Sequence, residues 1–178
     1  MANQTTQRIW SVDTVGIIST GPVVIDKIIY YVADHADVAK FTYWEESATA
    51  QTTKSAATVS ATASTRTLDS TGNFATADVD VGDIVKILAS NSKNVGTYMV
   101  ATNADNNTIT VGAAQTILDD TSKVYAWKTI RPNEFITLHG SKLTDDDTPV
   151  EVCFDGFRVP NLCLESISAS GRILIYLS

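Results

Sequence analysis

The chain has 178 residues, of which 44% are hydrophobic and 19% charged, and its formal net charge is −7. This composition supports a packed core and excludes a chain that is disordered throughout. The acidic balance, without a cluster of Lys and Arg, argues against a nucleic-acid-binding surface, because phosphate contacts need clustered basic side chains. The longest apolar run, residues 21–32, is interrupted by Asp26 and Lys27 and is too short to span a membrane.

Short segments rich in β-branched and aromatic residues follow one another along the chain, with turn residues between them. None of them has the i, i+3, i+4, i+7 apolar spacing of an amphipathic helix. We expect strands at residues 8–12, 15–20, 23–33, 38–45, 58–68, 83–89, 96–102, 107–112, 123–130, 135–140, 150–164 and 172–177. About ten to twelve short strands of this kind predict an all-β sandwich or barrel.

The segment ESATAQTTKSAATVSATAST, residues 46–65, consists mostly of Ala, Ser and Thr. Small polar side chains bury too little surface to offset the entropy lost when they are ordered, so we expect a flexible connection from residue 46 through about residue 55. From Thr58 onward, Thr and Ser alternate with Val and Ala, which predicts a Thr-rich strand.

The composition also changes at this point. Residues 56–127 are rich in Thr, Ala, Asp and Asn, whereas the flanks, residues 1–55 and 128–178, hold most of the Ile, Phe and Tyr. We therefore predict a discontinuous core domain, a jelly-roll-like β-sandwich built from the two flanks, with a small β-barrel-like domain inserted in one of its loops. Insertion requires two strand ends that lie close together at the surface. One continuous sandwich with a mobile loop is the alternative.

Two local patterns in the C-terminal part lead to specific expectations. Asp155-Gly156 lies between two strand-like arms and predicts a tight two-residue hairpin. Cys153 and Cys163 lie in apolar strand-like runs, so we expect reduced thiols packed in the core rather than a disulfide framework or a zinc site.

No residue pattern points to catalysis, a metal or a cofactor. His35 in a turn and His139 at a strand end lack further converging ligands, and no Ser or Cys has the context of a nucleophile elbow. Asp145–Asp147 lacks the alternate spacing of a calcium loop, so an exposed acidic loop is expected. We therefore predict that the chain is not an enzyme.

Tryptophan could supply a sugar-stacking platform, which would make the chain a carbohydrate-binding module. Each of the three falls in an alternating strand, where core or interface packing is favoured. The three residues are Trp10, Trp44 and Trp127.

The last predicted strand is apolar on both faces, because every residue after Arg172 up to residue 177 is apolar or aromatic. A strand with one face in water alternates apolar and polar residues. The strand is therefore either covered on both sides within a sandwich, or its second face meets another subunit. Residues 27–32 share this character. The candidate interface consists of Ile29, Tyr31, Ile173, Leu174, Ile175, Tyr176 and Leu177.

The middle of the chain contains a Phe before a Val-Gly-Asp turn, an Asn/Gly turn leading into Gly-Thr-Tyr-x-Val, and a closing Thr-x-Thr-Val strand. These residues are Phe74, Val81-Gly82-Asp83, Asn94, Gly96-Thr97-Tyr98, Val100 and Thr108–Val111. The pattern resembles structural proteins of tailed bacteriophages. The segments QRIWSVDT, KIIYYVA and GRILIYLS, from the flanks, are similar to small phage virion proteins with a compact β-sandwich.

The resemblance implies a non-enzymatic virion protein, most simply a capsid cement or decoration protein that clamps neighbouring capsid subunits. A head–tail adaptor or a tail or receptor-facing component is the alternative. Expected partners are copies of the chain itself, as a dimer or trimer, and phage capsid or tail proteins, but neither nucleic acid nor membrane. The N-terminal residues include no apolar stretch of signal-peptide length, so we expect synthesis in the host cytoplasm and a final location in the virion.

Overall fold

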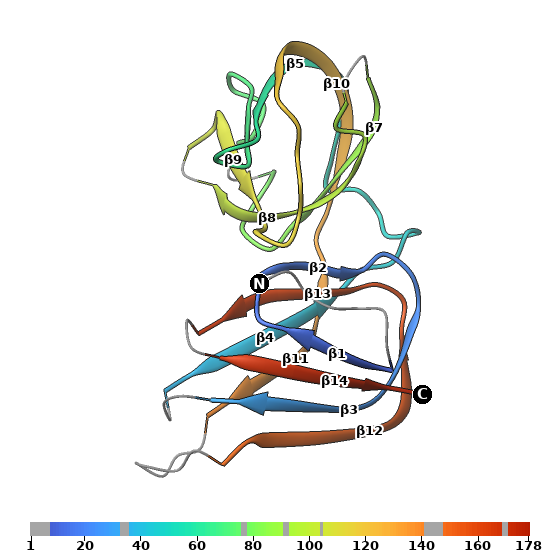
Figure 1. Cartoon of the computed structure of the whole chain (residues 1–178). Coiled ribbons are helices and arrows are strands. Elements are labelled where there is room, and N and C mark those ends of the chain that lie inside the picture. Colours follow the sequence, from blue (N-terminus) through green and yellow to red (C-terminus); the bar gives the residue numbers. More distant parts are fainter. Residues whose placement is uncertain are drawn as a thin grey trace. The chain divides into compact units, whose positions relative to one another are not determined.

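The computed structural model describes residues 8–32, 36–75, 78–90, 93–103, 105–140, 148–168 and 171–178. Every regular element in these ranges is a β-strand, which confirms the predicted all-β class (Figure 1). The chain forms two compact units. Unit 1 consists of residues 1–43 and 133–178, and unit 2 consists of residues 44–132.

Unit 1 contains two four-stranded sheets in which all neighbouring strands are antiparallel. The first sheet has the order β1-β14-β3-β12, and the second has the order β11-β4-β13-β2. The strands are β1 (Ile9–Val12), β2 (Gly16–Ser19), β3 (Val23–Tyr31), β4 (Val38–Tyr43), β11 (Asn133–His139), β12 (Val150–Val159), β13 (Leu162–Ile167) and β14 (Arg172–Leu177).

Side chains from both sheets of unit 1 meet in one hydrophobic core, so the two sheets pack face to face. Ile28 of β3 and Ile175 of β14 enter it from the first sheet, and Phe41 of β4 and Leu164 of β13 enter it from the second. All four are fully buried. Buried and accessible residues alternate along β2 and over most of β14, as the two-residue period of a strand requires.

Unit 2 is inserted between two strands that are neighbours in a sheet of unit 1. β4 ends at Tyr43 and β11 begins at Asn133, and these two residues face each other in the antiparallel ladder. The chain therefore leaves and re-enters unit 1 at adjacent positions, where a short hairpin turn would otherwise join the strands.

Replacing residues 44–132 by an Asn-Gly turn is expected to leave unit 1 folded, because Tyr43 and Asn133 already lie opposite each other. Far-UV circular dichroism and the dispersion of amide proton resonances would measure this. A shortened chain without a cooperative thermal transition would contradict the description of unit 1 as an independent core.

Unit 2 is a closed antiparallel barrel with the strand order β10-β5-β6-β9-β8-β7, which confirms the predicted barrel. Side chains fill its interior. The rings of Phe74 and Trp127 lie there with their centroids 5.2 Å apart. The strands are β5 (Thr52–Thr62), β6 (Thr67–Asp69), β7 (Ile84–Ser90), β8 (Gly96–Asn103), β9 (Thr108–Val111) and β10 (Asp120–Ile130).

Most of the Ala/Ser/Thr tract forms strand β5. Thr52 and Thr53 already pair with Thr129 and Lys128 of β10, so the prediction of a flexible connection through residue 55 is wrong. The neighbouring strand satisfies the backbone N–H and C=O groups of this segment. Its small side chains therefore need not bury a large apolar area to hold it in place.

Because β5 pairs with β10, the boundaries between the units differ from the predicted ones. The predicted boundaries, after residues 55 and 127, fall inside β5 and β10. The units divide instead after residues 43 and 132. A change in composition marked the segment but could not locate its ends, because β5 and β10 pair along most of their lengths and belong to one barrel.

The Val81-Gly82-Asp83 turn precedes β7, and its Asp83 binds Arg131, which follows the last strand of the barrel. Gly82 has a φ of 88°, in the region that favours glycine. The Asp83 carboxylate is buried, and it accepts a hydrogen bond from the Asp80 N–H at 2.8 Å. It also pairs with the Arg131 guanidinium at 3.3 Å. Because Arg131 directly follows β10, this buried carboxylate holds the segment that leaves the barrel.

Asp155 and Gly156 do not form a hairpin, and that prediction is wrong. Both residues have positive φ, 50° and 85°, as a tight turn would require, but they lie within β12. The ladder with β3 shifts between Cys153 and Phe157, so the pair forms a β-bulge and the strand continues. β12 is at the edge of its sheet, where such a bulge disturbs only one ladder.

Candidate assembly face

The seven residues of the predicted interface divide between the two sides of the first sheet. Ile173 and Ile175 are 0% exposed in the core of unit 1, so their own chain covers them. Leu177 packs against the same core. We correct the predicted interface for Ile173 and Ile175, because a second molecule cannot reach these two side chains while unit 1 is folded. Leu177 is only half-buried.

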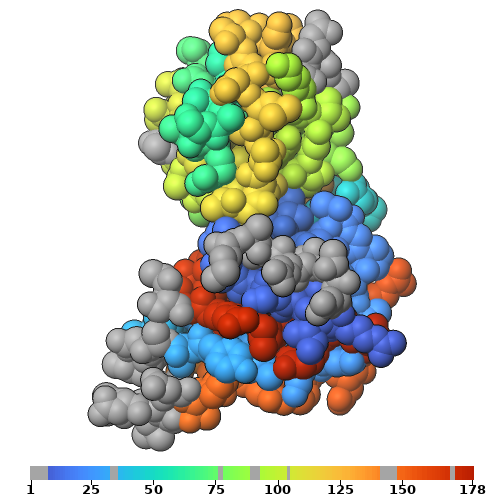
Figure 2. Space-filling view, in the orientation of Figure 1, coloured from blue at the N-terminus to red at the C-terminus, as the bar shows by residue number. Residues whose placement is uncertain are grey.

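The other four predicted residues lie on the outward side of the sheet. Leu174 is opposite Ile29, and Tyr176 is opposite Ile9 of β1. Ile9 is 43% exposed and Tyr31 is 41% exposed, Leu174 and Tyr176 are half-buried, and Ile29 is nearly covered. We call these five residues the apolar face. Figure 2 shows the three strands that carry it as successive bands, β1 blue, β14 red and β3 lighter blue, with β12 in orange at the edge of the sheet.

Charged groups flank the apolar face. Lys27 Nζ lies 3.2 Å from Glu151 Oε1 and 4.8 Å from the centroid of the Tyr176 ring. The hydrogen bond to Glu151 raises the pKa of Lys27 above its ordinary value. Arg172 Nε donates to Ser11 Oγ at 3.3 Å. A hydrophobic centre with charged groups beside it has the composition of a protein–protein contact.

An aromatic stack that was not predicted from the sequence joins the edge strands of the two sheets. The Phe135 ring of β11 lies 5.1 Å from the Phe154 ring and 5.8 Å from the Phe157 ring, both of β12. Phe157 is 53% exposed. The one sequence signal is the run Phe-Asp-Gly-Phe at residues 154–157, in which the bulge brings two Phe residues to the same neighbour.

The two cysteines are free and lie in different environments. Cys163 is buried, as predicted, and burial raises the pKa of its thiol well above the ordinary value. Cys153 is exposed, so the prediction of core packing is wrong for this residue. In β12 the side chains alternate, and Cys153 falls on the side that faces away from the core.

Iodoacetamide at pH 8 is expected to modify one thiol of the native protein, at Cys153. The raised pKa keeps Cys163 protonated and burial blocks access, whereas thiolate is the reactive form. Intact-mass spectrometry counts the adducts, and denaturant should expose the second site. The Cys153→Ser variant is the control and should stay unmodified when folded. Two adducts on the native chain would contradict this assignment.

The remaining candidate residues that the structure describes do not form a site. All three tryptophans are buried, so none offers a ring face for sugar stacking: Trp10, Trp44 and Trp127. His139 is exposed at the end of β11, which confirms its predicted position at a strand end. His35 and Asp145–Asp147 lie outside the described residues.

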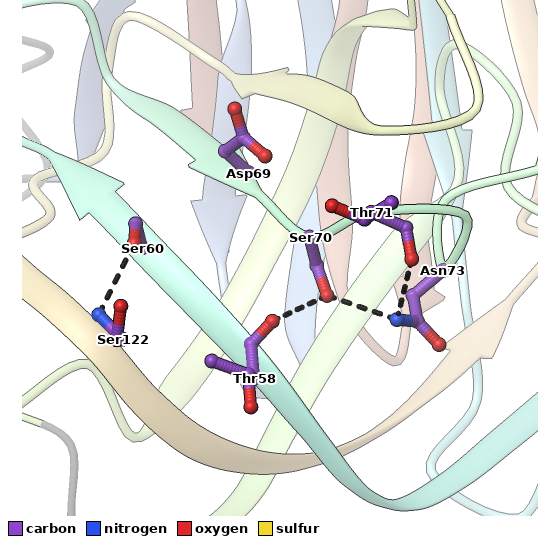
Figure 3. A pocket seen from close by; sticks show the side chains of 7 residues that line it. All are labelled: Thr58, Ser60, Asp69, Ser70, Thr71, Asn73 and Ser122. Atoms are coloured by element: carbon purple, nitrogen blue, oxygen red, sulfur yellow. Dashed lines mark hydrogen bonds between the residues drawn. The ribbon is translucent and has the colours of Figure 1, made fainter.

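A polar hollow of about 360 Å³ opens on the barrel (Figure 3). Ser70 Oγ donates to the Thr58 carbonyl at 2.6 Å and accepts from Asn73 Nδ2 at 3.1 Å. The Ser122 N–H donates to Ser60 Oγ at 3.1 Å. The lining residues are Thr58, Ser60, Asp69, Ser70, Thr71, Asn73 and Ser122. Asp69 is the one ionisable side chain among them, so these residues contain no acid–base pair.

No protein-family model, curated protein or solved structure matches the chain. Among the described residues, no group of three or more His, Cys, Asp or Glu could hold a metal ion. The described segments also contain no helix capable of crossing a membrane. Function must therefore be inferred from the geometry of the chain itself.

Proposed function

We propose that the chain is a non-enzymatic structural component of a tailed-bacteriophage virion, specifically a capsid cement or decoration protein. The apolar face carries this proposal. A sheet that shows one side to water normally has polar side chains on that side. Here the outward side of the first sheet presents Ile9, Tyr31 and Leu174 beside Ile29 and Tyr176. Ser11, Lys27 and Arg172 lie among them on the same side. Exposed apolar side chains gathered on one sheet face are typical of a surface that binds another molecule.

The strand order of unit 1 supports a jelly-roll assignment, which we include in the proposal. When its strands are counted alone, β1 to β4 are the first to fourth and β11 to β14 are the fifth to eighth. The sheet orders then become 1-8-3-6 and 5-4-7-2. Eight strands in two sheets with two Greek keys make a jelly roll, a fold that recurs in viral capsid domains. A fold alone does not give a function.

In this role the chain acts as a clamp. The apolar face of unit 1 packs against capsid subunits or against sibling copies in a dimer or trimer, and each copy adds contact area between neighbours. Covering apolar surface contributes about 25 cal/mol per Å². Association and ordering costs offset much of that gain. On a capsid with many identical sites, copies that also contact one another bind more tightly than a single copy would, because many weak contacts act together.

A head–tail adaptor or a tail or receptor-facing component is the alternative role, with the same face joining copies into a ring. A carbohydrate-binding module is a further alternative. Burial of the three tryptophans weighs against it, since sugar stacking needs an accessible ring.

The double variant Leu174→Thr/Tyr176→Thr is expected to weaken self-association about tenfold or more, since it removes two apolar contacts and keeps residues that favour strands. Sedimentation velocity over a concentration series measures this. Val81→Thr, at an exposed residue of unit 2, is the matched control and should associate like the parent chain. Unchanged association of the double variant would contradict the role of the apolar face.

Ile175→Asp should act differently from the double variant, because Ile175 is buried in the core. An unpaired carboxylate there is expected to unfold unit 1 rather than separate folded copies. Circular dichroism distinguishes the two effects. A folded monomer would show that Ile175 meets a partner and not the core.

Immunogold electron microscopy of phage particles from the source of the gene tests the proposed location. Label on the capsid shell is the expected result. Label at the neck or tail would support the adaptor alternative and overturn the cement assignment. Absence of label from particles whose lysate contains the protein would overturn the virion proposal.

A further inference from the structure

The polar hollow on the barrel of unit 2 is built from three separate parts of the chain. Strand β5 contributes two of its seven lining residues, β6 and the turn after it contribute four, and β10 contributes the last. Five of the seven carry a hydroxyl group, one carries an amide and one carries a carboxylate. Its volume of about 360 Å³ falls within the range of small-molecule sites, about 300–1,000 Å³.

Hydrogen bonds within the barrel hold the floor of the hollow in place. Ser70 is buried, and its hydroxyl group is used in both directions, since it donates to the Thr58 carbonyl and accepts from Asn73 Nδ2. Asn73 Nδ2 also donates to the Thr71 carbonyl at 3.1 Å. The Ser70 N–H donates to the carbonyl of Asn107, the residue before β9, at 2.8 Å. A surface fixed in this way loses little conformational freedom when a ligand binds.

Ser122 reaches the hollow at a bulge in β10. The ladder between β10 and β5 shifts between Asp120 and Lys123, and Ser122 has a φ of 50°. Its N–H donates to Ser60 Oγ at 3.1 Å, and the residue lines the hollow (Figure 3). Bulges re-aim side chains, and non-glycine residues with positive φ are strained, and both features gather at functional sites. The backbone of β10 therefore leaves regular pairing where it adds a hydroxyl group to the hollow.

Several polar groups of the lining have no hydrogen-bond partner within the described residues. They are the Asp69 carboxylate, Asn73 Oδ1 and the hydroxyl groups of Thr58, Thr71 and Ser122. The oxygens of Asp69 and Asn73 only accept, whereas hydroxyl groups both donate and accept. A metal ion would use only the acceptors, and an anion would use only the donors and be repelled by the carboxylate. The mixture therefore matches an uncharged ligand with several hydroxyl groups.

The outward surface of the barrel beside the hollow has the same chemistry. Ser60 of β5 lies opposite Asp69 of β6, which lies opposite Thr108 of β9. The residue before Asp69, Leu68, is buried in the barrel, so this row faces outward. The next outward row consists of Thr62, Thr67 and Thr110. A ligand longer than the hollow therefore meets further hydroxyl groups, and no basic side chain, in these two rows.

We propose that the hollow binds a neutral saccharide, with one sugar ring in the hollow and any further units along the two hydroxyl rows. Asp69 and Asn73 accept hydrogen bonds from the sugar, and the hydroxyl groups of the lining donate to the sugar oxygens. The contact uses the edge of the ring and its hydroxyl groups, so it does not need a tryptophan platform. Saccharide binding goes beyond the proposed function, because that role depends on the apolar face of unit 1.

Titration of the isotope-labelled full-length protein with four neutral sugars tests the site: glucose, galactose, mannose and N-acetylglucosamine. At least one of them, at millimolar concentration, is expected to shift the amide resonances of residues 69–73 and of Ser122 in a saturable way. Heteronuclear NMR spectra measure these shifts. No saturable shift with any of the four sugars, or shifts confined to other residues, overturns the inference. Shifts of the same resonances by calcium chloride without sugar would assign the hollow to a cation and also overturn it.

Two variants separate binding from folding. Asp69→Val keeps the size of the side chain and favours a strand, but it removes both acceptor oxygens and should weaken binding about tenfold or more. Ser122→Gly removes one hydroxyl group and accepts the positive φ without strain. Its binding should therefore weaken severalfold while its Tm does not fall, as expected for a strained residue kept for function.

Thr121→Ala is the matched control. Thr121 is the exposed neighbour of Ser122 in β10 and does not line the hollow, so this variant should bind like the parent chain. Circular dichroism establishes that each variant is folded, and Ser122→Gly decides alone if Asp69→Val is not. Binding that is unchanged in the folded variants, or equally weakened in Thr121→Ala, overturns the inference. Either result leaves the proposed location in the virion untouched, because immunogold labelling tests that separately.

Discussion

A strand has two faces, and a two-sheet unit can bury only one of them in its core. Strand β14 places Ile173 and Ile175 in that core and leaves Leu174 and Tyr176 on the outward side. Its neighbours continue the apolar surface with Ile9 on β1 and with Ile29 and Tyr31 on β3. The inward side supplies the hydrophobic core of unit 1, and the outward apolar residues are not members of that core. Their location is therefore better explained by a contact with another molecule, and the proposed role in an assembly depends on this reasoning.

The pairing of two neighbouring strands in unit 1 explains how unit 2 can be inserted there. Tyr43 and Asn133 are partners in a ladder, so any compact module with adjacent ends can replace the turn between them. The barrel meets this condition because β5 and β10, which carry its two ends, are neighbours. A chain with two modules can use separate surfaces for separate contacts. Weak contacts of this type gain strength when many copies are arranged together.

Strand periodicity and turn residues were sufficient to predict the all-β class, and the change in composition at the Ala/Ser/Thr tract predicted a barrel inserted in a discontinuous domain. Periodicity and turn residues alone do not give the arrangement of the strands. They could not predict strand order, because β1 pairs with β14 across nearly the whole sequence. The positive φ of Asp155 and Gly156 followed from residue type, whereas the path of the chain through them depended on the ladder with β3. In the same way, the pairing of β5 with β10 overrode the weak strand preference of small side chains. The sequence showed that β14 is apolar on both faces, but only the sheet order separates core from surface.

The most direct test of the apolar face is hydroxyl-radical footprinting of the full-length protein, below and above the concentration at which it associates. Tyr31 and Tyr176 are the reactive side chains of that face, and Tyr98, buried in the barrel of unit 2, is an internal reference. The account predicts that oxidation of Tyr31 and Tyr176 falls severalfold on association while that of Tyr98 stays low. Equal oxidation of Tyr31 and Tyr176 in the free and associated protein would contradict it.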